Sequence, residues 1–464
     1  MNIFRNCRFI LSETFNYLKM KTITIFGAGL SASTLIQYLL NHSTKHNWKI
    51  RVGDISEELA AQKINHHPNG YAFAFNLFDN EQKEREIQGA DAVISMLPAR
   101  FHPIVAECCV RHKTHMLTAS YVSKEMKELD TAAREAGIAM LNELGVDPGI
   151  DHMSAMRIVD EIKAKGGKLN VFKSSTGGLI APEYDNNPWN YKFTWNPRNV
   201  VVAGQGISQY LENKTIKYIP YHRLFERVEH ISMPNIGEFE IYPNRDSVSY
   251  RDIYQLRDIE TIFRGTMRRP GYCKAWNVFV QLGMTDDTYT LPNSETLTYR
   301  QFLASFMPHI KKQSLEKTFA SLSFVNHDKD IISRFKWLDM FGNHPINLIN
   351  ASPAQILQQI LEQKWILNPN DKDMITMQHL FEYELNGERK GLKSSLVVIG
   401  KDTAHTAMSI TVGTPLAIAA KLLLTGKFTM TGVHVPTQKE MYLPILKELK
   451  KFGIHFTEEE YTPE

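Results

Sequence analysis

The chain has 464 residues, of which 43% are hydrophobic and 22% carry a charged side chain. These proportions are ordinary for a globular protein, and the length allows two or three domains with sizeable cores. The 53 basic and 50 acidic residues give a formal net charge of +3, too balanced to indicate a nucleic-acid or polyanion binder. No apolar run approaches the roughly 20 residues that span a bilayer. We therefore expect neither a nucleic acid nor a membrane as partner.

Residues 1–19 precede Met20 and carry only a short apolar stretch without a small-residue cleavage site, which makes them a poor signal peptide. We expect this extension to lie outside the fold, which begins near Met20. The sequence has four cysteines: Cys7, Cys108, Cys109 and Cys273. They form neither a disulfide framework nor a C-x-x-C pair for zinc, which predicts buried thiols, no metal site and a cytoplasmic location.

Residues 22–40, TITIFGAGLSASTLIQYLL, combine a β-branched strand, a glycine turn and an apolar helical run. Gly27, Gly29 and Ala32 fit the G-x-G-x-x-G/A pattern, in which the glycines allow a tight turn and close approach of a pyrophosphate. A second strand, KIRVGD, ends in Asp54, which could accept hydrogen bonds from an adenosine ribose. The alternative is a doubly wound domain without a nucleotide.

Four further strands follow in residues 71–77, 90–98, 115–122 and 137–145, and helical segments such as 56–64, 102–113 and 124–136 separate most of them. Alternating strands and helices predict an α/β fold with a Rossmann-type, doubly wound parallel sheet. Ligands of such sheets bind at the carboxyl ends of the strands. Those ends carry Asn76, Met96, Leu97, Ser120, Tyr121, Val146 and Asp147.

The loop NELGVDPGIDHM, residues 142–153, is rich in residues with special backbone requirements. Gly145, Pro148 and Gly149 restrict or free φ so that the chain can leave the sheet. Asp151 lies near the start of the next helix, where an acid can cap free N–H groups. Asp147 lies just beyond the strand and is expected to face a ligand.

The middle of the chain changes character. Residues 170–250 mix strand-like runs with aromatic, Asn- and Pro-rich loops, and residues 257–390 are mostly helical. A return strand is expected in 394–401, then a helix in 414–427 with Pro415 near its start. The residues alone thus indicate an α+β substrate or dimerisation region after the first domain, followed by a helical region.

Several long motifs carry a resemblance to a known family: residues 120–153, 174–195, 242–247 (YPNRDS), 260–272 (ETIFRGTMRRPGY) and 411–427. Through them the sequence resembles the glutamate-forming saccharopine dehydrogenases, or saccharopine reductases, of lysine metabolism. The resemblance implies three domains: a dinucleotide-binding domain (20–146 and about 415–464), an α+β substrate or dimerisation domain (147–256 and about 393–414) and a helical domain (257–392). It also implies a homodimer that oxidises the secondary amine of saccharopine with a nicotinamide cofactor. The imine then hydrolyses to glutamate and 2-aminoadipate 6-semialdehyde, or the reaction runs in reverse.

The resemblance also implies the site residues. The implied substrate contacts are Ser120, Tyr121, Asp147, Arg245, Thr266, Met267 and Arg268, with Asp147 and Tyr121 as catalytic candidates. Saccharopine carries three carboxylates, and planar guanidinium groups bind carboxylates in a bidentate manner. The implied cofactor contacts are Gly27, Gly29, Leu30, Ser31, Ala32, Asp54, Ile55, Asn76, Leu77, Met96, Leu97, Thr118, Ala119, Val146 and Asn196.

Asp54 also bears on the choice of cofactor, because its charge would repel the 2′-phosphate of NADP. We therefore expect NAD to be preferred, with NADP possible. His102 and His152 are candidates for the general base, because histidine is the residue type that ordinarily exchanges protons near neutral pH, but the sequence does not assign the role to either. Two other functions remain open: a related C–N bond reductase such as carboxynorspermidine dehydrogenase, or a nucleotide sensor without catalysis.

Overall fold

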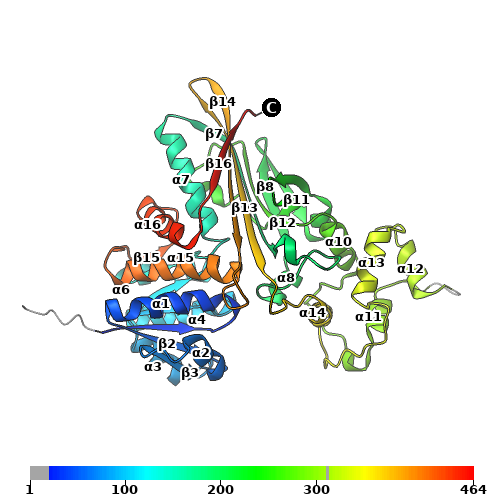
Figure 1. Cartoon of the computed structure of the whole chain (residues 1–464), viewed down its shortest axis with the longest axis horizontal. Coiled ribbons are helices and arrows are strands. Elements are labelled where there is room, and N and C mark those ends of the chain that lie inside the picture. The colour runs from blue at the N-terminus through cyan, green and yellow to red at the C-terminus, as the bar shows by residue number, and fades with distance from the viewer. Residues whose placement is uncertain (1–19, 310–312, 464) are drawn as a thin grey trace, which may run out of the picture.

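The computed structural model describes residues 20–309 and 313–463, so the expected extension in residues 1–19 lies outside the described residues. Two β-sheets organise the chain: a seven-stranded parallel sheet and a nine-stranded mixed sheet. Figure 1 shows the first sheet with its helices at the lower left, the long strands of the second sheet in the centre, and a group of helices at the right.

The seven-stranded sheet has the strand order β15-β6-β5-β4-β1-β2-β3, and every pairing in it is parallel. Its strands are β1 Lys21–Phe26, β2 Trp48–Asp54, β3 Gly70–Ala74, β4 Ala92–Ser95, β5 His115–Thr118, β6 Ala139–Leu141 and β15 Gly432–His434. The order reverses between β1 and β4, which is the switch point where Rossmann folds bind nucleotides. The expected Rossmann-type sheet is confirmed.

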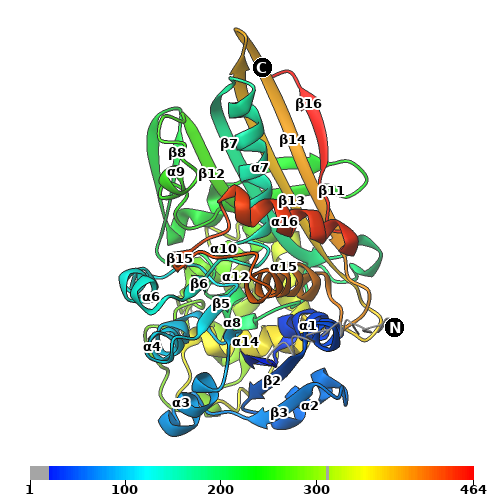
Figure 2. The same cartoon turned by 90° about the vertical axis from the view of Figure 1, so that its left-hand side faces the viewer.

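Helices cover both faces of this sheet, and Figure 2 shows α4 and α6 on one side with α1 and α15 on the other. The first face carries α3 Asn80–Gln88, α4 His102–His112, α5 Lys124–Glu128 and α6 Asp130–Ala136. The second carries α1 Ser33–His46, α2 Glu57–Ile64, α15 Ala407–Leu424 and α16 Lys439–Leu449. The helix expected in residues 124–136 is thus two helices, with Leu129 between them.

Helix α15 is the core helix of the C-terminal segment. Among the described residues it alone is long and apolar enough to cross a membrane, and 89% of that apolar window is buried inside the protein. Burial of this kind is typical of a central helix in a folded domain. Pro415 lies inside the helix rather than near its start, because α15 begins at Ala407.

The nine-stranded sheet is built from the middle of the chain and three late strands. These are β7 Lys168–Ile180, β8 Ile207–Glu212, β9 Thr215–Pro220, β10 Glu229–Met233, β11 Gly237–Pro243, β12 Thr261–Arg268, β13 Asp373–Leu385, β14 Glu388–Ile399 and β16 Thr457–Tyr461. The main order is β10-β11-β12-β7-β13-β14-β16, and β8 joins β12 to β9. Helix α7, Ile150–Ala164, packs against β7 and β13 and also contacts α16.

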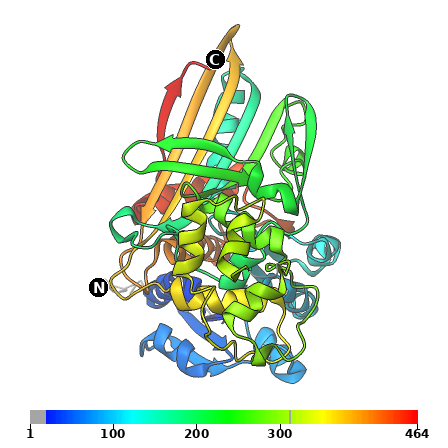
Figure 3. The ribbon, with the colours of Figure 1, turned by 90° about the vertical axis from the view of Figure 1, so that its right-hand side faces the viewer.

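The helical part runs from Tyr272 to Lys364, and Figure 3 shows its green to yellow helices gathered in front, below the long strands. It contains α10 Tyr272–Leu282, α11 Tyr299–Ser305, α12 Leu315–Ser321, α13 Lys329–Trp337 and α14 Pro353–Lys364. Buried aromatic rings, including Trp189, Trp276 and Trp365, join these helices to the second sheet. The remaining short elements are α8 Pro197–Val201, α9 Tyr250–Ile253, η1 Leu30–Ala32, η2 Ala99–Phe101, η3 Pro182–Tyr184, η4 Tyr221–Glu226, η5 Ser294–Thr296 and η6 Lys450–Phe452.

The domain boundaries differ from those expected. The range 257–392 contains β12, β13 and the start of β14, all of which belong to the nine-stranded sheet. Residues of β13 alternate between the two faces of that sheet, so their period is two rather than the helical 3.6. Strand β16 pairs with β14, so the chain does not end in the dinucleotide-binding domain as expected. Its five residues include three glutamates, and an edge strand of this kind has no local apolar pattern.

Candidate active site

The loop after β1 leaves open space beside its backbone. Gly27 has a φ of +102°, and a Cβ there would lie 3.0 Å from the Met96 carbonyl oxygen, so the turn requires glycine. A Cβ on Gly29 would meet no atom within 4 Å, and Leu30 is 56% exposed. Ala32 is buried where η1 leads into α1. Because the first N–H groups of a helix lack intrahelical acceptors, this open loop suits an anionic pyrophosphate.

Asp54 holds this loop to the second strand. Its Oδ2 accepts a hydrogen bond of 2.7 Å from the Ala28 N–H, and its Oδ1 accepts one of 3.0 Å from the Ser56 N–H. Both carboxylate oxygens therefore have backbone partners. The next residue, Ile55, is 91% exposed and leaves the end of β2 open to a ligand.

Most other residues expected at the cofactor lie at or beyond the carboxyl ends of the parallel strands: Ser31, Asn76, Leu77, Met96, Leu97, Thr118, Ala119 and Val146. The sheet topology brings these ends to one edge, as predicted. Asn196 is elsewhere, on the loop before α8, where its side chain accepts a hydrogen bond from the Arg198 N–H and caps that helix.

His102, at the start of α4, is a buried centre of hydrogen bonds near this edge. Its Nδ1 lies 2.9 Å from Ser95 Oγ, and its Nε2 lies 2.8 Å from Ser120 Oγ and 3.1 Å from Thr118 Oγ1. Burial lowers the pKa of His102 to about 4, so the imidazole is neutral at physiological pH. The ring therefore fixes the Ser120 hydroxyl rather than carrying a charge.

Asp147, in the loop after β6, and Asp151, in the first turn of α7, share one buried arginine. Arg264 Nη2 lies 2.7 Å from Asp147 Oδ1 and 2.8 Å from Asp151 Oδ2. The Tyr121 hydroxyl donates a 2.8 Å hydrogen bond to Asp147 Oδ1. Burial raises the pKa of Asp147, although the charge of Arg264 opposes that rise. Asp147 is thus held beside a tyrosine and an arginine, with a carboxyl group that takes up a proton more readily than usual.

Asp151 has the structural position expected of it. Its Oδ1 accepts a 2.6 Å hydrogen bond from the N–H of Gly149, the residue that precedes α7, and its side chain is 1% exposed. Gly149 has a φ of +147°, and a Cβ there would lie 2.1 Å from the Gly145 carbonyl oxygen. The peptide between Asp147 and Pro148 is cis. The turn therefore depends on glycine and on the buried carboxylate of Asp151, which also pairs with Arg264.

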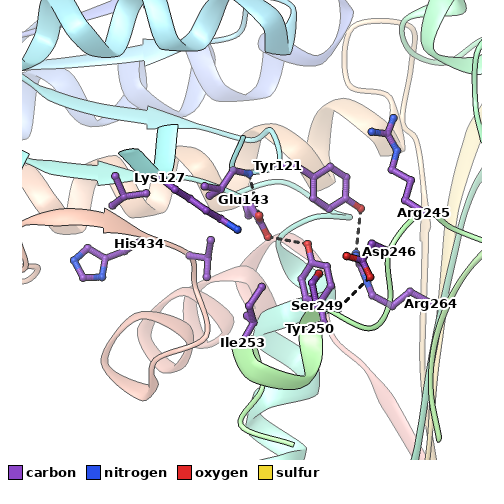
Figure 4. Close-up of a pocket in the computed structure, with 13 residues that line it drawn as sticks. Tyr121, Lys127, Glu143, Arg245, Asp246, Ser249, Tyr250, Ile253, Arg264 and His434 are labelled. Atoms are coloured by element: carbon purple, nitrogen blue, oxygen red, sulfur yellow. Dashed lines mark hydrogen bonds between the residues drawn. The ribbon is translucent and has the colours of Figure 1, made fainter. Parts of the chain in front are cut away.

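A pocket of about 360 Å³ opens beside Tyr121. Figure 4 shows Tyr121 between Glu143 and Arg245, with Tyr250 and Arg264 below. The full lining is Tyr121, Val122, Lys127, Glu143, Arg245, Asp246, Ser249, Tyr250, Ile253, Arg264, Val433, His434 and Val435. Three segments of the dinucleotide-binding domain, the segment around α9 and Arg264 of β12 thus enclose a space with three cationic side chains.

Arg245 and Arg268 occupy different surroundings. Arg245 is an exposed residue of the pocket, and its guanidinium carbon lies 5.9 Å from the centre of the Tyr121 ring. Arg268 is 4% exposed and does not line the pocket. On β12 it lies four residues after Arg264, roughly 13 Å further along the strand. The structure therefore does not bring these two predicted substrate arginines together in one pocket.

Arg268 is a buried cation among aromatic rings. Its guanidinium carbon lies 5.1 to 5.8 Å from the ring centres of Tyr191, Tyr242 and Tyr272. Its Nη1 donates to the Met267 carbonyl, its Nε has no hydrogen-bond partner, and among the described residues no carboxylate forms an ion pair with it. Met267 is fully buried and Thr266 is half-buried beside it. A buried charge without a counter-ion is costly unless a ligand supplies one.

No metal-binding spacing is present along the chain, but the fold brings three possible ligands together. Atoms of Glu84, Cys108 and His112 lie within 4.8 Å of one another between α3 and α4. Glu84 already pairs with both His112 and Arg111. These contacts account for the group without an ion.

The glycine loop at the switch point of a Rossmann sheet, together with the charged pocket beside it, defines the class of nucleotide-binding oxidoreductases. Two family models match the chain: the saccharopine dehydrogenase NADP binding domain over residues 23–141 and the saccharopine dehydrogenase C-terminal domain over residues 145–454. The chain belongs to the saccharopine dehydrogenase family, as its sequence motifs predicted.

Individual relatives agree. The chain is 33% identical to the saccharopine dehydrogenase [NADP(+), L-glutamate-forming] of Schizosaccharomyces pombe, over 95% of this chain and 99% of that protein. It is also 33% identical to rat mitochondrial alpha-aminoadipic semialdehyde synthase, covering 96% of this chain but 48% of that protein. The solved apo saccharopine dehydrogenase (L-Glu forming) of Saccharomyces cerevisiae superposes with a TM-score of 0.84 at 31% identity, over 95% of this chain and all of that one.

The expected preference for NAD is wrong. The names of the yeast relatives specify NADP(+), and the matching family model is an NADP binding domain. The prediction treated Asp54 as a free carboxylate facing the ribose. In the structure both of its oxygens accept backbone N–H groups, so its charge is engaged in holding the glycine loop.

Sequence reasoning missed Arg264, Glu143 and Tyr250, all of which line the pocket. Arg264 could have been found, because an arginine inside the apolar run TIFRGTM is typical of a buried, paired charge. Glu143 and Tyr250 gave no comparable indication, since their proximity depends on how the two domains pack.

Proposed function

We propose that this protein is an NADP+-dependent enzyme that oxidises saccharopine at the carbon–nitrogen bond of its secondary amine. Hydrolysis of the resulting imine gives L-glutamate and 2-aminoadipate 6-semialdehyde, and the reverse reaction forms saccharopine. The proposal rests on membership of the saccharopine dehydrogenase family and on the names of relatives that align over nearly the whole chain.

The observation that carries the substrate assignment is the unpaired Arg268. Its buried guanidinium has aromatic neighbours and no carboxylate partner among the described residues. Arg245, which lines the pocket, likewise forms no ion pair among the residues that the structure describes. A substrate with three carboxylates supplies counter-ions for both, in the bidentate manner that guanidinium groups favour.

The glycine loop fits a dinucleotide, because Gly29 borders open space at the start of a helical segment. Gly27, Gly29 and Ala32 would hold the pyrophosphate, and the strand ends that carry Met96 and Thr118 would border the nicotinamide. Bound there, NADP+ supplies the hydride acceptor. The His102–Ser120 hydrogen bond fixes a hydroxyl between this region and the pocket.

Asp147 and Tyr121 are the residues proposed to handle the proton. The secondary amine must lose a proton before its carbon releases hydride, and Asp147 lies at the carboxyl edge of the sheet with a raised pKa. Tyr121 and Arg264 hold that carboxylate through hydrogen bonds of 2.8 and 2.7 Å. Asp147 is therefore proposed as the acceptor of the amine proton.

Two rivals are weaker. A reductase that acts on a polyamine with fewer carboxylates needs fewer guanidinium groups to bind them. A sensor without catalysis has no need of the Asp147–Tyr121–Arg264 arrangement.

The test is turnover by the purified protein, followed as NADPH formation with saccharopine and with carboxynorspermidine. We expect NADPH and glutamate in equal amounts from saccharopine alone. Turnover of carboxynorspermidine alone would establish the rival reductase, and binding of NADPH without turnover of either would establish the sensor. A homodimer and a cytoplasmic location stay predictions; the latter is supported by Cys108, Cys109 and Cys273, which are buried and free.

A further inference from the structure

Glu143 lies in the loop after β6 with a φ of +56°, a left-handed conformation that residues other than glycine and asparagine seldom adopt. This conformation brings its backbone N–H and its side chain to the same neighbouring segment. The N–H donates a 3.1 Å hydrogen bond to the Ser120 carbonyl, and Oε1 accepts a 3.0 Å hydrogen bond from the Val122 N–H. One residue thus holds both peptide groups that flank Tyr121.

The other carboxylate oxygen of Glu143, Oε2, contacts His152 and Tyr250. His152 Nε2 lies 2.7 Å from Oε2, and His152 Nδ1 lies 2.6 Å from the Tyr254 hydroxyl. The Tyr250 hydroxyl donates to Oε2 at 3.3 Å. Glu143 is 3% exposed and His152 is fully buried. Because both carboxylate oxygens already have hydrogen-bond partners in the protein, we assign this carboxylate a positioning role rather than a role in ligand binding.

These contacts lead directly to the residues proposed for proton transfer. Tyr121 donates to Asp147, and the Tyr250 ring lies 4.2 Å from the guanidinium carbon of Arg264, which pairs with Asp147. Figure 4 shows the hydrogen bond between Tyr250 and Glu143, and the hydrogen bond that Arg264 donates to the Tyr121 hydroxyl. A strained residue whose contacts converge on an active site indicates a functional constraint.

We propose that Glu143, backed by His152, is a positioning residue that clamps Tyr121 against Asp147 for the reaction. The inference rests on the proposed function, because its readout is saccharopine turnover. In this proposal Glu143 neither contacts the substrate nor transfers a proton. It acts only through Tyr121, so its effect on turnover should depend on the Tyr121 hydroxyl.

The first variant is Glu143→Gln, which keeps the size of the side chain but replaces one acceptor oxygen by a donor NH2. If the NH2 group faces Val122, the Val122 N–H loses its acceptor. If it faces the other side, the Tyr250 hydroxyl loses its acceptor and His152 keeps its contact only by changing tautomer. We expect kcat for saccharopine to fall about tenfold while the Kd for NADP+ changes less than about twofold. An unchanged kcat in a folded Glu143→Gln protein overturns the clamp.

The matched control is Asp373→Asn. Asp373 is 1% exposed and accepts hydrogen bonds from the backbone N–H groups of Ala407 and Met408, so it is an equally buried carboxylate with a purely structural setting. We expect this variant to lower Tm and to keep the wild-type kcat. If Glu143→Gln lowers kcat no more than Asp373→Asn does, the role of Glu143 is structural only.

A double-mutant cycle separates action through Tyr121 from a general disturbance. In a Tyr121→Phe background, Glu143→Gln is expected to lower kcat by less than about twofold, because the hydroxyl that the clamp positions is already gone. Losses that simply multiply would overturn the mechanism. If Glu143→Gln fails to fold, Tyr254→Phe is the second variant, because it removes only the hydroxyl that holds His152. We expect its kcat to be about threefold lower than that of the wild type. A wild-type kcat in Tyr254→Phe overturns the clamp. A wild-type protein that does not turn over saccharopine contradicts the proposed function instead.

Discussion

Replacing Arg268 with methionine removes a buried cation but keeps most of the side-chain volume. If Arg268 binds a substrate carboxylate, the change removes a charge-assisted hydrogen bond that is worth about 1.5–3 kcal/mol, and KM for saccharopine rises roughly 10- to 150-fold. Stability responds differently. Replacing a buried ion pair by apolar side chains of similar volume is neutral or stabilising by about 1–4 kcal/mol, and removing an ion that has no counter-ion in the protein should stabilise the fold at least as much. Loss of contacts with three tyrosine rings opposes this gain by up to about 2 kcal/mol each, the value for desolvated groups, so the two effects are of similar size and Tm should change by no more than a few degrees.

Steady-state kinetics at saturating NADP+ and a thermal melt of the same preparation measure both effects. Arg334→Met is the control, because Arg334 is also buried and lies 5.8 Å from the Trp189 ring, but pairs with Asp330 at 2.9 Å. We expect the control to lower Tm and to leave KM unchanged. A wild-type KM in Arg268→Met, or a Tm that falls as far as in the control, refutes the proposal that Arg268 binds a carboxylate of the substrate.

Three further outcomes are expected. Asp147→Asn should lower kcat/KM for saccharopine at least about tenfold, equivalent to about 1.4 kcal/mol, with NADP+ affinity intact by fluorescence titration; full activity would exclude it from proton transfer. Asp151→Asn should chiefly lower Tm, because it breaks a buried pair with Arg264, and a normal Tm with lost activity would exchange the roles of the two acids. His102 has a pKa of about 4 when folded and about 6.5 when unfolded, so the unfolded state binds the proton first and stability falls by about 2 kcal/mol from pH 7 to pH 5. His102→Gln should remove that part of the pH dependence in urea unfolding, and an unchanged slope would contradict the burial argument.

Local sequence determined the dinucleotide-binding domain. The run TITIFGAGLSA predicted a strand, a glycine turn and a helix, and the structure has β1, η1 and α1 in those places. Strands that alternate with helices leave few topologies, so the parallel sheet and its ligand-binding edge also followed. The roles of Gly149 and Asp151 in the turn before α7 were local as well, because they depend on φ and on N–H groups only two residues away.

The tertiary structure decided the rest. Strand β16 has no apolar pattern of its own, and only its pairing with β14 places it in the second sheet. Asp54 was expected beside a ribose, but the fold turns it to the N–H of Ala28, 26 positions away in the chain. Arg264 meets Asp147 across a separation of 117 residues, and Glu143 meets Tyr250 across 107. Such contacts leave no local pattern, because packing between the two sheets, rather than periodicity along the chain, decides which charged side chains meet a partner of opposite charge.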